Sequence, residues 1–269
     1  MKSVIRSFVL CFLLAFASAR SLPSQGDYAA PILAGISNHG QNKARPYVTA
    51  GDRAYLIGMQ DGNFPDMGEH LRGEMGGLWL HPIKLIDGFR AEVTDVATNR
   101  HIALSESTEF VNYPYGNLFR YGQLLDSVSI DRFQFSPDGQ PGLIVRYTIR
   151  NATDRRRELS FQFSVKTDLR SVWSEHHAIR EARDSVVWSS TNALFVARDT
   201  DNPWFCVWGA TPSAGAHPIA HPTPIVTKGM GVTAASSYNL SVAPHGTSTL
   251  TFVIAGSTTS RGAAVNAYS

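Results

Sequence analysis

The sequence predicts an all-β protein, a large sandwich of two antiparallel sheets with few or no helices apart from its two ends. From Pro46 onward, apolar side chains alternate with polar ones at a period of two, which is typical of strands with one buried face. Clusters of Gly, Pro, Asn and Asp separate these runs, and no stretch shows a sustained helical repeat with caps. We therefore expect about a dozen strands packed as two sheets, with a closed barrel as the alternative.

Residues 1–19 predict a secretory signal peptide. Lys2 and Arg6 precede an apolar run over residues 8–16, and residues 17–19 (Ala-Ser-Ala) give the small-residue pattern at which signal peptidase cleaves. The apolar run is about half of the roughly 20 residues that a membrane-spanning helix needs. We therefore expect an exported protein, periplasmic or extracellular, with no membrane association after cleavage.

Composition excludes two further classes. Removing Lys2 and Arg6 with the signal leaves 22 basic residues against 22 acidic ones, so no basic surface favours nucleic acid. Loss of Cys11 leaves Cys206 as the single cysteine, and the fold must be held by its core rather than by disulfides. The remaining chain of about 250 residues is enough for one large domain.

Residues 20–45 mix Pro, Gly, Ser and Asn without periodicity and predict a flexible N-terminal arm. A β-sandwich domain over residues 46–256 follows. Its clearest strands lie at 143–150 and 159–166, where alternation predicts an antiparallel pair with one wet face, and residues 130–135 add a third strand to this meander. Further strands are expected at 53–59, 78–85, 89–96, 186–189, 193–197, 204–208, 238–242 and 249–255, separated by turns at 61–62, 87–88, 191–192, 202–203 and 243–246.

The end of the chain changes character. Possible N-cap residues at 258–260 are followed by alanines, which indicates the start of a helix. Isolated helices this short are marginal in water. We therefore interpret residues 257–269 as the start of a linker.

Two long stretches carry a resemblance. "GDRAYLIGMQDGNFPDMGEHLRGEMGGLWLHPIKLIDGF" (51–89) and "SPDGQPGLIVRYTIRNATDRRRELSFQFSVKTDLRSVW" (136–173) resemble the N-terminal domain of bacterial exported glycogen-debranching-like glycoside hydrolases, the amylo-α-1,6-glucosidase type of six-hairpin glycosidase. The resemblance covers about residues 46–255. It implies a supersandwich fold of the galactose-mutarotase-like kind, joined by linker helices to an α/α barrel that carries both catalytic carboxylates. The expected ligand is an α-glucan oligosaccharide or polysaccharide.

The same resemblance implies that this chain is a non-catalytic scaffold, because the sequence ends where the linker should begin and the barrel is missing. No residue here then inherits the role of catalytic acid or base, and we expect no cofactor and no metal. The chain would support the barrel and rim its active site.

The glycine-rich stretch over residues 61–81 holds the main candidates for contact with sugar or with a partner domain: Asp61, Asp66, Glu69, Arg72, Glu74, Trp79 and His81. A glycosidase needs two opposed carboxyls, but loops seldom hold such a pair without a supporting shell. The alternatives are a catalytic dyad, solvated carboxylates, or a loop that contacts a partner, and we favour the last. Alternation across residues 78–85 places Trp79, His81 and Ile83 on one face and Leu78, Leu80 and Lys84 on the other, so Trp79 is a core residue or a partner contact.

Other candidates are weaker. Trp173, Glu175 and His176 form a secondary set, but adjacent histidines on an extended chain point apart and do not favour a metal site. His217 and His221 lie in a proline-rich surface loop. Asn151 and Asn239 begin tripeptides that match the glycosylation acceptor pattern.

Two function classes remain as alternatives. A free-standing carbohydrate-binding module would use exposed aromatic side chains, for which Tyr113, Tyr115 and Trp173 are candidates. A mutarotase-like aldose epimerase would need His176 or His81 near a glutamate in a concave pocket.

Overall fold

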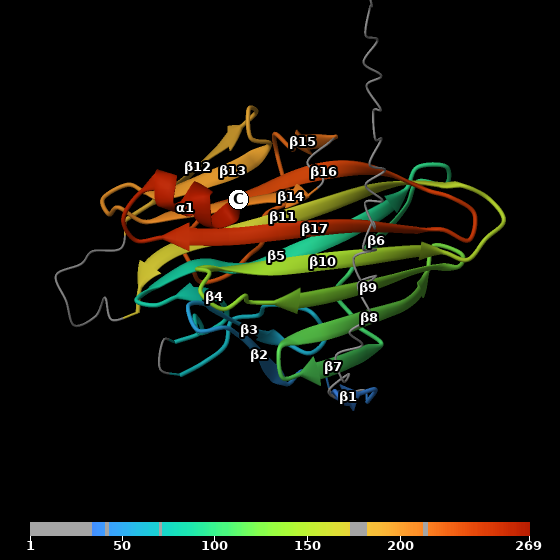
Figure 1. Cartoon of the computed structure of the whole chain (residues 1–269), viewed down its shortest axis with the longest axis horizontal. Helices are drawn as coiled ribbons and strands as arrows, with labels where there is room; N and C mark the ends of the chain where they lie inside the picture. Colours follow the sequence, from blue (N-terminus) through green and yellow to red (C-terminus); the bar gives the residue numbers. More distant parts are fainter. Residues whose placement is uncertain (1–33, 41–42, 70–71, 173–181, 212–214) are drawn as a thin grey trace, which may run out of the picture. The chain divides into compact units, whose positions relative to one another are not determined.

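A computed structural model describes residues 34–40, 43–69, 72–172, 182–211 and 215–269. It confirms the predicted all-β sandwich of two large antiparallel sheets (Figure 1). The predicted signal peptide and the secondary candidates Trp173, Glu175 and His176 lie outside the described residues.

The nine-stranded sheet follows the order β1 (Ile36–Asn38), β7 (Glu109–Tyr113), β8 (Gly116–Leu124), β9 (Val128–Phe135), β10 (Gly142–Asn151), β17 (Thr247–Ser257), β14 (Phe205–Thr211), β13 (Leu194–Asp199) and β12 (Asp184–Ser189). The eight-stranded sheet follows β15 (Ala216–Pro218), β16 (Thr233–Val242), β11 (Arg157–Ser171), β5 (Ile83–Asp95), β4 (Gly77–Leu80), β3 (Tyr55–Met59) and β2 (Pro46–Ala50), with β6 (Arg100–Ala103) paired to β5. Part of the predicted arm is therefore ordered, because β1 pairs with β7 and places Ile36 opposite Asn112.

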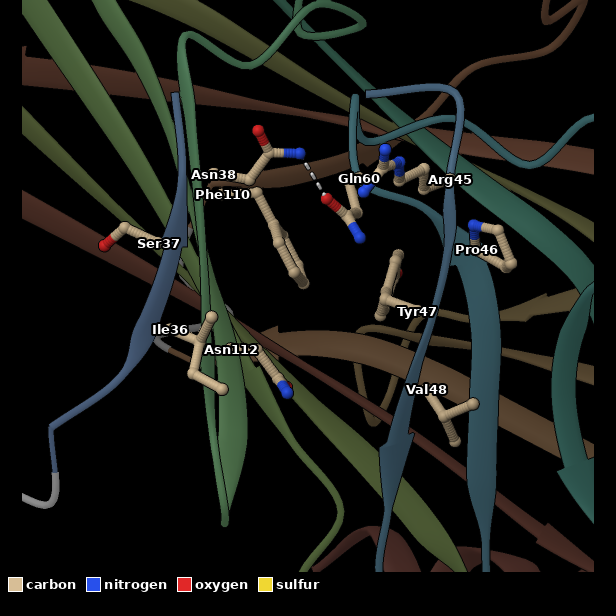
Figure 2. Close-up of a pocket in the computed structure, with 10 residues that line it drawn as sticks. All are labelled: Ile36, Ser37, Asn38, Arg45, Pro46, Tyr47, Val48, Gln60, Phe110 and Asn112. Carbon is tan, nitrogen blue, oxygen red and sulfur yellow. Dashed lines mark hydrogen bonds between the residues drawn. The ribbon is translucent and has the colours of Figure 1, made fainter. Parts of the chain in front are cut away.

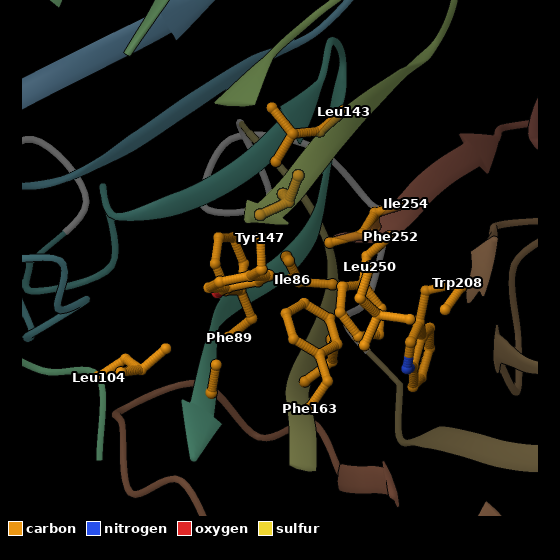
Figure 3. Close-up of a cluster of buried hydrophobic side chains, with 14 of the residues drawn as sticks. Ile86, Phe89, Leu104, Leu143, Tyr147, Phe163, Trp208, Leu250, Phe252 and Ile254 are labelled. Carbon is orange, nitrogen blue, oxygen red and sulfur yellow. The ribbon is translucent and has the colours of Figure 1, made fainter. Parts of the chain in front are cut away.

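The inner faces of the two sheets form one apolar core (Figure 3). Leu143, Val145, Tyr147 and Ile149 are all at most 1% exposed, as their alternation predicts. Across the core, the Phe163 and Phe252 rings stack with centroids 3.8 Å apart. Burial of each such side chain contributes about 1.5–3 kcal/mol, so a one-residue register slip would forfeit the whole set.

The predicted pairing of residues 143–150 with 159–166 is wrong. Strand β10 pairs with β9 and β17, whereas β11 pairs with β5 and β16 in the other sheet. The two segments face each other across the core, where the Tyr147 and Phe161 rings lie 4.9 Å apart. Alternation identifies the buried face of a strand but not its neighbour, and the β10–β11 connection crosses between the sheets.

Asn151 shapes this crossing. Its side-chain amide donates to the carbonyl oxygens of Arg155 (2.6 Å), Val242 (3.3 Å) and Ala243 (3.0 Å), and it is 2% exposed. A side chain held in this way is not accessible as a glycosylation acceptor, whereas Asn239 is exposed.

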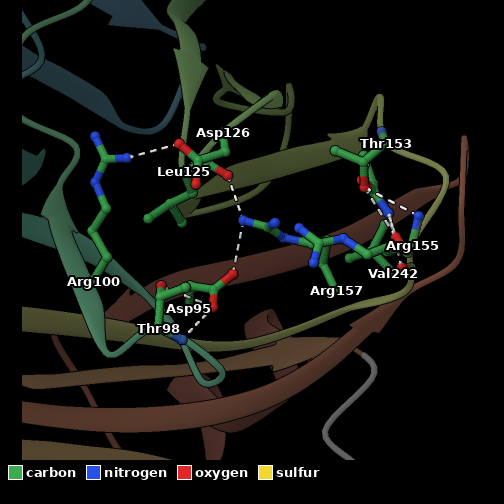
Figure 4. A network of polar contacts seen from close by, with 10 residues as sticks. Asp95, Thr98, Arg100, Leu125, Asp126, Thr153, Arg155, Arg157 and Val242 are labelled. Atoms are coloured by element: carbon green, nitrogen blue, oxygen red, sulfur yellow. Dashed lines mark hydrogen bonds and ion pairs between the residues drawn. The ribbon is translucent and has the colours of Figure 1, made fainter.

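An ion pair next to the crossing ties β11 to its surroundings (Figure 4). Arg157 Nη2 lies 2.8 Å from Asp95 Oδ2 and donates to the carbonyl oxygen of Leu125. Asp95 also accepts hydrogen bonds from the backbone N–H and the hydroxyl of Thr98. Burial acts to raise the pKa of Asp95, but the Thr98 hydrogen bonds and the Arg157 charge outweigh it, and the pKa lies below its ordinary value.

The predicted C-terminal helix is present as α1 (Arg261–Tyr268). The Ser260 hydroxyl caps its first turn by accepting from the Ala263 N–H at 3.1 Å. Its Ala264 is buried against residues of β13, β14 and β17, so the helix packs on the nine-stranded sheet (Figure 1). Within the part of the chain that the structure describes, no helix is long and apolar enough to cross a membrane.

Candidate functional site

Two segments cover the outer face of the eight-stranded sheet. One is the second part of the loop between β3 and β4, described over residues 66–69 and 72–76, and the other is the segment over residues 225–232 that precedes β16. We call these two segments the outer-face site, together with the sheet residues that they contact, Trp79, Lys84, Asp87, Asp168 and Arg170. The Lys228 backbone N–H donates to Asp66 Oδ1 at 3.1 Å, and Lys228 Nζ donates to the Arg72 carbonyl oxygen at 3.4 Å. These two contacts join the loop to the segment.

Glycines let the segment approach the sheet closely. A Cβ added to Gly229 would lie 2.2 Å from Asp87 Oδ2, and one added to Gly231 would lie 1.8 Å from the Thr167 carbonyl oxygen. Lys166 Nζ donates to the Gly231 carbonyl oxygen at 2.5 Å. Larger residues at these two positions would push the segment away from β5 and β11.

Beneath the segment lies a buried charged cluster. Lys84 of β5 is 0% exposed; its Nζ lies 3.0 Å from Asp168 Oδ2, contacts Asp87 Oδ1, and donates to the Glu74 carbonyl oxygen at 3.0 Å. The Thr227 hydroxyl donates to the second oxygen of Asp87 at 2.5 Å. The cluster therefore links the sheet to the loop through Lys84 and to the 225–232 segment through Asp87.

A second ion pair fixes the end of the loop. Arg170 of β11 pairs with the Glu74 carboxylate, and their side chains are 9% and 19% exposed. An ionised carboxylate can only accept hydrogen bonds, and the Glu74 carboxylate accepts one from the Arg170 guanidinium. This contact anchors the end of the loop to β11.

Trp79 lies on the same outer face and is 1% exposed. Its indole N–H donates to the Met75 carbonyl oxygen at 3.0 Å, and its ring stacks on Tyr55 with centroids 6.4 Å apart. The predicted separation of Trp79 from Leu78 and Leu80 is confirmed, because the two leucines face the inter-sheet core and Trp79 does not. The predicted faces of Ile83 and Lys84 are wrong, because Ile83 pairs with Leu80 in the core and Lys84 pairs with Trp79. A turn at residues 81–82 divides the predicted strand into β4 and β5 and resets the alternation.

The other predicted residues divide into three groups. Asp61 accepts from the Asn63 backbone N–H at 2.8 Å at the base of the loop, and Arg132 in the core donates to the adjacent Gly62 carbonyl oxygen at 3.2 Å. Glu69 and Arg72 are exposed on the loop. His81 is exposed away from the loop, beside a cavity of about 240 Å³, and none of the described residues that line this cavity carries a carboxylate side chain.

A cavity of about 430 Å³ opens between residues 61–65 and the start of the 225–232 segment. The Phe64 and Phe89 rings, 4.8 Å apart, form its apolar wall, while Asp61 and Arg90 are its charged groups. Val226 at this cavity is 91% exposed. This mixture of apolar wall and a few polar groups is typical of ligand or partner sites.

The segment also exposes apolar side chains. Val226, Met230 and Val232 are 91%, 61% and 39% exposed, next to the charged residues Arg72 and Lys228. Apolar side chains surrounded by charged ones are typical of protein interfaces.

Sequence reasoning missed the residues that hold this site together. Residues 87–88 were predicted to be a turn, whereas Asp87 and Gly88 lie inside β5, and a Cβ on Gly88 would lie 2.5 Å from the Phe64 ring. A lysine inside an otherwise apolar strand was an available signal for Lys84. Nothing local linked it to Asp168, which is far away in the sequence.

Within the described ranges, no group of three or more His, Cys, Asp or Glu could hold a metal ion. No protein-family model and no curated protein matches the chain.

Several solved structures are similar in fold. A protein described as a kojibiose phosphorylase from the human microbiome gives a TM-score of 0.47 at 7% identity, covering 83% of this chain and 32% of that one. A protein described as an aldose 1-epimerase from Escherichia coli K12 gives 0.49 at 7% identity, covering 79% and 99%. A galactose mutarotase related enzyme from Lactobacillus acidophilus gives 0.45 at 8% identity, covering 81% and 99%. These similarities concern the arrangement of strands and say nothing about activity.

Proposed function

We propose that the chain is the non-catalytic N-terminal scaffold domain of an exported, debranching-type glycoside hydrolase that acts on α-glucans. In this proposal the outer-face site docks an α/α-barrel catalytic domain. The exposed residues of the loop, Glu69 and Arg72, then lie at the rim of the glucan site.

The observation that carries the proposal is the set of contacts that the Glu74 and Asp66 carboxylates make. Glycoside hydrolysis needs two carboxyls about 5–9.5 Å apart across the bond, one of them with a raised pKa. Glu74 instead pairs with Arg170, and Asp66 accepts from the Lys228 backbone. These contacts use the Glu74 and Asp66 carboxylates to hold the loop in place.

The docking role rests on the 225–232 segment. It is anchored from beneath by Thr227 and the two close-packed glycines, and it presents Val226, Met230 and Val232 to solvent. A rigid support with exposed apolar side chains suits a permanent interface, because little order must be created on binding.

Met230→Asp tests the docking role. The binding partner is a purified six-hairpin barrel domain encoded in frame with this chain or beside it, and affinity is measured by calorimetry. We expect affinity to fall at least about tenfold, since a charge would be buried at the interface. Val187→Asp is the matched control, because Val187 is 57% exposed on β12 of the other sheet and should leave affinity unchanged. Equal losses, or no loss for Met230→Asp, would contradict the proposal.

A second candidate function, a carbohydrate-binding module, is favoured by one observation. Tyr115 is 52% exposed and stacks on Tyr113 at 5.6 Å, and both rings lie within 6.5 Å of Phe133. Such an aromatic surface can contact sugar rings. Retardation of the chain in gels containing glycogen, abolished by Tyr115→Ala, would support this candidate, and unretarded migration of the unaltered chain would exclude it.

A further inference from the structure

A cleft of about 520 Å³ lies where the edge strands of the two sheets meet (Figure 2). Strands β1 and β7 form one wall, and β2 with Arg45 and Gln60 forms the other. The Tyr47 and Phe110 rings, 5.4 Å apart, close the space between them, and Ile36 and Val48 are exposed at 75% and 53%.

A chain of hydrogen bonds, each donated in the same direction, ends at Asn112 on one wall. Gln134 Nε2 donates to the Thr49 hydroxyl at 2.8 Å, and that hydroxyl donates to Asn117 Oδ1. Asn117 Nδ2 then donates to Asn112 Oδ1 at 2.8 Å. Because the Asn112 carbonyl is occupied, its NH₂ group is left as the terminal donor, and Figure 2 shows this nitrogen directed toward the cleft.

A hydrogen bond also orients the side-chain amide of Gln60 on the opposite wall. Asn38 Nδ2 donates to Gln60 Oε1 at 2.7 Å, which fixes the orientation of the Gln60 amide. The NH₂ group of Gln60 also faces the cleft (Figure 2). The exposed guanidinium of Arg45 lies beside it, and no Asp or Glu is among the described residues that line the cleft.

The cleft therefore presents N–H donors from two walls, one positive charge and a small apolar surface. We propose that it binds a carboxylated sugar of the hexuronate class. The carboxylate accepts hydrogen bonds from Arg45 and the two amides, and the apolar face of the sugar ring lies against Tyr47 and Phe110.

An added peptide strand fits these edges less well. Pro46 lacks an N–H at the start of β2, and β1 has only three residues, so neither edge offers a continuous ladder. The proposal is independent of the α-glucan proposal, because no residue of the outer-face site lines the cleft.

Calorimetric titration of the full chain with D-glucuronate tests this inference, with D-glucose and acetate as comparison ligands. We expect saturable binding of glucuronate, and binding at least about tenfold weaker for glucose, which lacks the carboxylate, and for acetate, which lacks the ring. Asn112→Asp keeps the acceptor for Asn117 but replaces the donor with a negative charge, and should weaken glucuronate about tenfold or more. Asn239→Asp, the same change at an exposed position of β16, should not weaken glucuronate binding.

Arg45→Met provides a second variant should Asn112→Asp fail to fold, and it should also weaken glucuronate. Four results would overturn the inference: absence of saturable glucuronate binding, equal affinity for glucuronate and glucose, equal affinity for glucuronate and acetate, or unchanged affinity in both cleft variants. Tighter binding of a short peptide through its terminal carboxylate would also overturn it in favour of a peptide site.

Discussion

Replacing Lys84 with methionine would remove the cation that pairs with two buried carboxylates, those of Asp87 and Asp168. Nζ lies 3.0 Å from Asp168 Oδ2 and contacts Asp87, and the partner side chains are 1% and 5% exposed. At an effective dielectric constant of about 20, charges this close attract by about 5 kcal/mol, and desolvation offsets much of that gain. Removing one member of a buried pair costs about 3–5 kcal/mol, so we expect Lys84→Met to lower the free energy of unfolding by about that amount.

Urea unfolding followed by tryptophan fluorescence measures this loss as a lower midpoint with an unchanged slope. Arg100→Met is the control, because its ion pair with Asp126 is largely exposed and should contribute only about 0–1 kcal/mol. Adding Asp168→Asn to Lys84→Met removes one of the two buried negative charges and should restore about 1 kcal/mol or more. A cost for Lys84→Met no larger than that of Arg100→Met would refute the reasoning.

Three further outcomes follow from the structure. Because the folded pKa of Asp95 is depressed, its stabilisation is present above about pH 4 and is lost as the pH falls through the folded value. Asp95→Asn should therefore flatten the acid-side fall of the unfolding free energy in urea titrations, and an unchanged fall would argue against this role. Asn151→Ala strands three carbonyl oxygens at the crossing and should cost about 2 kcal/mol or more by the same assay, whereas a loss below about 0.5 kcal/mol would contradict it. Burial raises the pKa of the Cys206 thiol far above its ordinary value, so in a Cys11→Ser chain a thiol reagent should react only after denaturation, and rapid native labelling would be inconsistent with this.

The strands themselves could be predicted from the sequence because period-two alternation is a local property. Leu143 to Ile149 show the buried face correctly, and the turn at 243–246 and the helix after Ser260 also occur where they were expected. The pairing of these strands could not be predicted in the same way. Strand β10 pairs with β17 about a hundred residues later, and no local pattern distinguishes that partner from β11.

The candidate site was predicted in part. Within the stretch over residues 61–81, the described residues up to Gly76 form a loop anchored on the sheet, and residues 77–80 form β4. Asp66, Arg72, Glu74 and Trp79 all contribute to this anchoring. His81 does not, because the turn before β5 directs it elsewhere. The charged cluster was missed because Asp87 was assigned to a turn, whereas it lies on β5 with Lys84, and because Asp168 comes from β11, far along the sequence. A buried lysine is stable only when such partners offset the loss of hydration.

The most direct test of the scaffold role compares hydrolysis of glycogen by this chain alone, by a six-hairpin barrel domain encoded with it or beside it, and by the two together. We expect no turnover above buffer from this chain alone and higher turnover from the mixture than from the barrel. Turnover by the chain alone, or a mixture no more active than the barrel, would contradict the proposal that its chemistry is completed by a docked partner.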